Sequence, residues 1–92
     1  MKLFAKQQLE DYLRKTEREF RAEISKSLST EQKIGYIVDL IAEKATHLGI
    51  YEREARLPRG NRGYYLSCRR NIILCKFKLE LYTTVLTEII LE

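Results

Sequence analysis

Turn-forming residues are scarce in this sequence. Its 92 residues include one proline and four glycines, and three of those glycines lie with the proline between Gly49 and Gly63. A fold built from many short strands is excluded, because the tight turns between strands depend on glycine, proline and asparagine. The chain therefore has few segments, and we expect long helices with one main loop.

Residues that commonly build catalytic or metal centres are also few. There is a single histidine, His47, and two cysteines, Cys68 and Cys75. Seven residues along a helix span about 10 Å, which is too far for a disulfide within one chain. The cysteines also lack the Cys-x-x-Cys spacing of redox and zinc sites. We therefore expect structural cysteines and a protein that is not an enzyme, with no metal and no cofactor.

Long apolar runs are missing as well. No segment approaches the length of about 18 apolar residues that a membrane-spanning helix requires. The first residues, Met1 to Gln8, lack the apolar core of a secretory signal and soon become charged. The sequence thus predicts no membrane partner and a cytoplasmic location.

Apolar periodicity predicts an all-α protein of one domain, residues 1–92, with three helices at about 2–27, 30–48 and 64–91. A narrow stripe from Leu9 to Ile24 recurs every three or four residues in the first helix. Ser29 and Gln32 form the sequence signature of a capping box before the second helix, and Gly49 is expected to end that helix. An arginine-rich loop, 49–63, would join it to the third.

The third predicted helix is long and apolar, with no glycine or proline after Gly63. Apolar residues alternate at spacings of three and four for nearly four heptads, and further apolar residues lie off this seam. A helix that is apolar on several sides needs several partners, so we expect a homodimer or higher oligomer, with a monomeric three-helix bundle as the alternative. The predicted oligomer interface is the seam itself: Tyr65, Cys68, Ile72, Cys75, Leu79, Tyr82, Leu86 and Ile89.

Positive charge is concentrated in one part of the chain. Eight Lys or Arg residues and only two Glu lie between Arg53 and Glu80, whereas the whole chain has a net charge of +4. Six of the nine arginines fall within eighteen residues, and arginine suits bidentate contact with phosphate or carboxylate. One end of the molecule should therefore attract anions.

These features predict non-catalytic capture of a phosphate-bearing ligand, either nucleic acid or a nucleotide. Arginine interleaved with tyrosine is typical of surfaces that bind phosphates and stack on bases. The predicted ligand-binding residues are Arg53, Arg56, Arg59, Arg62, Tyr64, Tyr65, Arg69 and Arg70. The alternative is a small protein–protein interaction module, an adaptor or inhibitor of the phage-regulator type, that docks on an acidic partner. A helix-turn-helix with its turn near Gly49 is a further alternative, although Pro58 would break its recognition helix.

Overall fold

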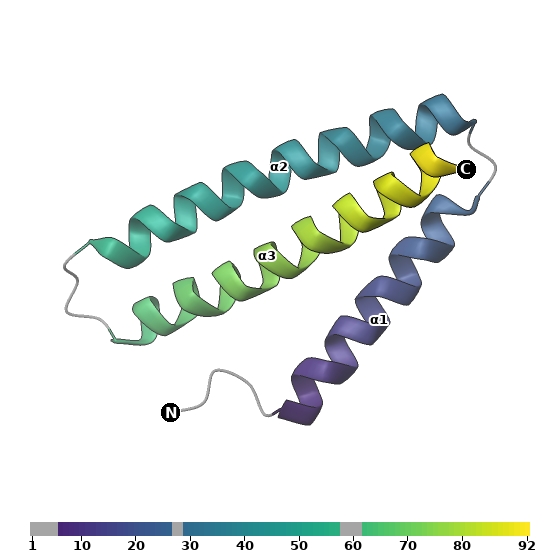
Figure 1. The fold of residues 1–92 in the computed structure, drawn as a ribbon. Helices are drawn as coiled ribbons and strands as arrows, with labels where there is room; N and C mark the ends of the chain where they lie inside the picture. Colours follow the sequence, from purple (N-terminus) through teal and green to yellow (C-terminus); the bar gives the residue numbers. More distant parts are fainter. Residues whose placement is uncertain (1–5, 27–28, 58–61) are drawn as a thin grey trace.

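Three helices form the chain. The computed structural model describes residues 6–26, 29–57 and 62–92, which contain α1 (Lys6–Ile24), α2 (Thr30–Arg56) and α3 (Arg62–Leu91). The all-α prediction is confirmed, since these residues include no strand. α2 and α3 lie side by side and antiparallel. The C-terminal part of α1 packs against the C-terminal half of α3, and the rest of α1 points away from α3 at an angle (Figure 1). None of the described helices is long and apolar enough to cross a membrane.

The predicted capping box begins α2. The Ser29 hydroxyl accepts the backbone N–H of Gln32 at 3.2 Å, and the Gln32 side chain accepts the backbone N–H of Ser29 at 2.9 Å. Two N–H groups that lack helical partners are satisfied in this way. The start of α2 is therefore encoded in its local sequence.

The predicted end of α2 is wrong. The helix continues past Gly49 to Arg56, and Gly49 does not adopt the positive φ of a helix-ending glycine. A glycine in a helix costs only about 1 kcal/mol relative to alanine, which packing can offset. Tyr51 and Ala55 continue the partly buried side of α2 beyond Gly49. The helix ends at Leu57, whose extended backbone is the conformation favoured before a proline such as Pro58.

The arginine-rich loop is consequently shorter than predicted. Residues 49–56 belong to α2, and α3 begins at Arg62 instead of Tyr64. The helix-turn-helix alternative is also wrong, because α2 runs without interruption through the residues assigned to its turn. The last turn of α2 and the first turns of α3 lie at the same end of the pair (Figure 1).

The main core lies where all three helices meet. Its buried members are Ile24, Ile37, Leu81, Tyr82, Val85 and Ile89. Ile37 has no exposed surface, and Phe20, Phe77 and Leu86 pack around the cluster. Towards the other end of α3, Cys68, Ile72 and Cys75 are also buried. Burial raises the pKa of the Cys75 thiol, although the charges of Lys44 and Lys78 oppose this, so the thiol stays protonated.

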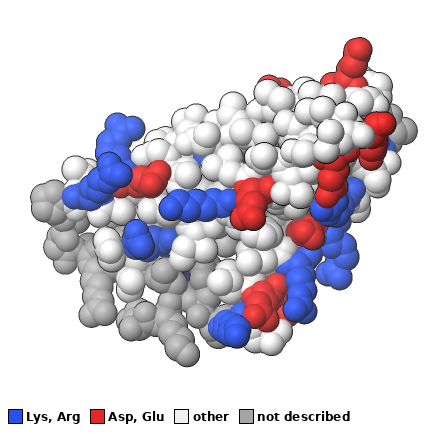
Figure 2. All heavy atoms as spheres, in the orientation of Figure 1, with Lys and Arg blue, Asp and Glu red and all other residues white. Residues whose placement is uncertain are grey.

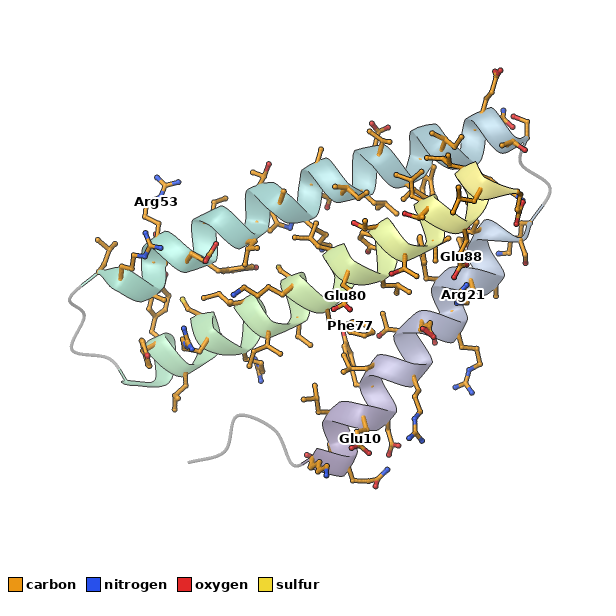
Figure 3. All side chains as sticks on the ribbon, viewed as in Figure 1. Glu10, Arg21, Arg53, Phe77, Glu80 and Glu88 are labelled. Atoms are coloured by element: carbon orange, nitrogen blue, oxygen red, sulfur yellow. The ribbon has the colours of Figure 1, made fainter. Side chains whose placement is uncertain are left out.

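α1 is held at its C-terminal end by three contacts of different kinds. Ile24 is buried in the core, and the rings of Phe20 and Tyr82 pack with their centroids 4.8 Å apart. Arg21 donates two hydrogen bonds to the carboxylate of Glu88 on α3, at 2.8 and 3.3 Å (Figure 3). Because α1 touches α3 over a short length only, these contacts decide its position.

The predicted oligomer seam is used within a single chain. Cys68, Ile72, Cys75, Tyr82 and Ile89 are each at most 9% exposed. The assignment of these five residues to a subunit interface is wrong, because the other helices already cover them. Leu79 and Leu86 are partly buried, and Tyr65 is exposed. Self-association stays a prediction, but it requires a different surface.

The central position of Ile37 gives a direct test of the packing. Replacing Ile37 with Ala should lower the free energy of unfolding by about 2–5 kcal/mol, since the deletion leaves a cavity that its neighbours fill only partly. Urea unfolding at fixed protein concentration measures this. The matched control is Ile73→Ala on α3, where the side chain is 37% exposed and the expected change is within about 1 kcal/mol. Equal losses in the two variants would contradict the assigned core.

The Arg21–Glu88 contact should make stability depend on pH. The hydrogen bonds from Arg21 hold the pKa of Glu88 below its ordinary value of 4.5. When folding lowers the pKa of a carboxylate, the carboxylate stabilises the folded state at pH values above its pKa in the unfolded chain. This stabilisation is lost as the pH falls through its pKa in the folded protein. The difference in Tm between wild type and Glu88→Gln should therefore be largest near neutral pH and vanish in acid. Glu80→Gln, without an ion pair among the described residues, should show no such trend.

Candidate phosphate-binding site

The predicted ligand-binding residues gather at the end of the α2–α3 pair. Arg53 and Arg56 lie in the last turn of α2, and Tyr64, Tyr65, Arg69 and Arg70 lie in the first turns of α3. The antiparallel packing of the two helices places these segments at the same end (Figure 1). Arg59 and the side chain of Arg62 lie outside the part of the chain that the structure describes, and the other six residues lie within it.

Three of them line one pocket. Arg56, Tyr65 and Arg69 surround a shallow pocket of about 160 Å³, together with Glu52, Ala55, Ile72 and Lys76. The walls come from both helices, so the pocket exists only because α2 extends beyond Gly49. Three basic side chains and one carboxylate give this pocket a formal charge of +2. Its polar groups therefore favour an anion.

The basic side chains of the pocket form no ion pair with the described part of the chain. In the described ranges, the ion pairs are Lys15–Glu19, Arg21–Glu17, Arg21–Glu88 and Lys26–Glu23. All of them involve α1 or the residues that follow it. Arg56, Arg69 and Lys76 take part in none. Their charges are thus available to an external anion, whereas much of the charge on α1 is balanced internally.

The distribution of charge along α3 adds to the positive charge at the end that holds the pocket. No acidic residue occurs from Arg62 to Lys78, and no basic residue occurs from Leu79 to Glu92. Figure 2 shows one face of the molecule: Lys and Arg predominate near the α2–α3 connection, whereas Asp and Glu are mixed with Lys and Arg towards the opposite end. An anion approaching the molecule is therefore attracted to the end that holds the pocket.

Three predicted residues lie outside the pocket. Arg53 projects from the side of α2 that faces away from α3 (Figure 3), and Arg70 is exposed but does not line the pocket. Tyr64 donates a hydrogen bond from its hydroxyl to the Glu54 carboxylate at 2.8 Å. This bond, with smaller effects of desolvation and of Cys68, raises the pKa of Tyr64 to about 12. Tyr64 therefore connects α3 to α2, and Tyr65 is the tyrosine beside the pocket.

Sequence reasoning did not assign Lys76 and Glu52 to the site. Tyr65, Arg69, Ile72 and Lys76 follow spacings of four, three and four, which places them on one side of a helix. That periodicity was a usable signal for Lys76. Glu52 could not be found in this way, because its segment was expected to be a loop.

The pocket has the chemistry of a contact site for a single anionic group. Ligand pockets that enclose a small molecule measure about 300–1,000 Å³, so this one is too small to enclose a nucleotide. Within the described residues, no group of three or more His, Cys, Asp or Glu side chains could hold a metal ion. Arg56 and Arg69 supply planar guanidinium groups, and Lys76 supplies a mobile ammonium group, which together suit phosphate oxygens.

Comparisons with protein-family models, with curated proteins and with solved structures find no match for this chain. Its own side chains are therefore the basis for a functional assignment.

Proposed function

We propose that this protein binds single-stranded nucleic acid through its phosphate backbone, without catalysis. The observation that carries the proposal is the pocket in which Arg56, Arg69 and Lys76 converge from two helices, outside the ion pairs of the described residues. Phosphate contacts of this kind supply most of the affinity of sequence-independent nucleic-acid binding. Glu52 offsets one charge, and the net charge of the pocket stays positive.

The shape of the site favours a polymer over a free nucleotide. A shallow pocket of about 160 Å³ can contact one phosphate group but cannot surround a base and sugar. Arg53 and Arg70 are exposed on other sides of the same end of the molecule, where they add long-range attraction. A chain of phosphates can use the pocket and this surrounding charge together.

Tyr65 is the candidate for contact with a base. It lines the pocket beside Arg69, and 45% of its surface is exposed. Stacking of a base on an aromatic side chain contributes about 1–3 kcal/mol and accepts any base. Bases of a single strand are accessible to such stacking, whereas those of a duplex are already stacked on each other. This is why the proposal specifies a single strand.

Removing the three basic side chains of the pocket should weaken binding. The variant Arg56→Ala/Arg69→Ala/Lys76→Ala is expected to lose roughly tenfold or more in affinity for a labelled single-stranded oligonucleotide, because a charge-assisted hydrogen bond contributes about 1.5–3 kcal/mol. The slope of log K against log salt should also become shallower by about 2, since three phosphate contacts each contribute about 0.7. Fluorescence anisotropy at several salt concentrations measures both quantities.

The matched control removes three exposed basic residues from α1, Arg14→Ala/Lys15→Ala/Arg18→Ala, and so changes the net charge by the same amount. It should bind more tightly than the pocket variant. Equal losses in both variants would show that only net charge matters and would contradict the proposed site. Equally strong, salt-sensitive binding of wild type to polyglutamate would instead support the acidic protein partner.

A further inference from the structure

The side of α2 that faces away from α3 has no partner among the described residues. We call it the outer face of α2, and every one of its members is exposed: Glu31, Gly35, Val38, Ala42, Thr46, Gly49 and Arg53. They recur at spacings of three and four along the whole helix, which at 1.5 Å per residue is about 40 Å long. Arg53 marks this side in Figure 3.

The order of charge on α2 makes this face complementary to itself. The exposed acidic residues of α2 are Glu31, Asp39 and Glu43, all in its first half. Its exposed arginines are Arg53 and Arg56, both in its last turn. On the outer face itself, the charged members are Glu31 at one end and Arg53 at the other. An identical helix in the opposite direction would meet opposite charges at both ends.

The middle of the outer face allows a close approach of that second helix. A Cβ atom added at Gly35 or Gly49 would meet nothing within 4 Å, so both positions are open. Val38 is 47% exposed, and the Thr46 hydroxyl is turned back onto the carbonyl oxygen of Ala42 at 3.0 Å. Among the members of the outer face, the central ones therefore present small or apolar groups and the charged ones lie at the two ends, while the exposed Asp39 and Glu43 lie beside the centre on the flank of the helix.

We propose that a second copy of this chain packs antiparallel against the outer face of α2, about a two-fold axis near Ala42. This axis relates residues equally distant from Ala42, so Glu31 faces Arg53 of the second copy, and Gly35 faces its Gly49. Both contacts occur twice, as a two-fold interface requires. A parallel arrangement would bring Glu31 to Glu31 and Arg53 to Arg53, which like-charge repulsion disfavours.

This interface replaces the predicted α3 seam, five of whose eight residues are buried within one chain. It also gives Arg53 a role apart from the pocket of Arg56, Arg69 and Lys76. The antiparallel arrangement places the two pockets of the dimer at opposite ends. The interface and the phosphate site can therefore be tested separately.

Charge reversal tests the proposal with the full chain. Wild type should have twice the 10.9 kDa chain mass by light scattering or sedimentation. Glu31→Arg places two arginines opposite each other, and Arg53→Glu places two glutamates opposite each other. Each variant alone should shift towards the mass of one chain. Circular dichroism and the unfolding midpoint establish that each variant is still folded.

Mixing the two variants is the decisive step. In an equimolar mixture, the arginine introduced by Glu31→Arg in one chain faces the glutamate introduced by Arg53→Glu in the other. The unchanged Glu31 and Arg53 face each other at the second contact. The dimer mass should return, with one copy of each variant. The matched control is Glu80→Arg, a charge reversal on an exposed position of α3 that should leave the mass unchanged.

Three results would overturn the proposal. The first is a wild-type mass of 10.9 kDa at about 1 mM chain, where any association stronger than about 4 kcal/mol is populated. The second is an unchanged dimer in either single variant. The third is a mixture that stays monomeric although both variants are folded. None of these results depends on nucleic-acid binding, so the proposed function would have to be judged by its own test.

Discussion

The packing of α2 against α3 is the constraint on which the other features depend. It buries Cys68, Ile72 and Cys75 at one end and joins the three-helix core around Ile37 at the other. Because the two helices are antiparallel, the same packing brings the last turn of α2 beside the first turns of α3. The pocket, its positive charge and the contact between Tyr64 and Glu54 all follow from that juxtaposition.

Charge segregation gives the two ends of the molecule different properties. Basic residues near α1 are paired with Glu17, Glu19, Glu23 and Glu88, and the pair of Arg21 with Glu88 joins α1 to α3. The first half of α3 has no acidic residue that could do the same. At the other end, Arg56, Arg69 and Lys76 form no ion pair with the described residues, so their charge is available to attract a ligand. The outer face of α2 repeats this polarity along a single helix.

Local signals in the sequence predicted the all-α fold, the capping box at Ser29 and the region of the basic site. The end of α2 and the helix that covers the seam of α3 depend on tertiary packing, so these local signals could not predict them. Glycine commonly ends a helix, yet α2 continues past Gly49 through the partly buried Tyr51 and Ala55. The sequence identified the apolar seam of α3. Its periodicity predicts that another helix covers the seam, but it does not predict whether that helix belongs to the same chain or to a second copy. Lys76 was recognisable from its spacing, whereas Glu52 depended on the extension of α2.

The central claim is that a nucleic-acid strand contacts the end of the α2–α3 pair. Amide chemical shifts of the labelled protein, titrated with a single-stranded oligonucleotide, test it most directly because they report every segment at once. We expect saturable changes from Glu52 to Arg56 and from Tyr65 to Lys76, with little change over α1. Changes centred on α1 or on α3 beyond Leu79, or no saturable change at all, would contradict the account.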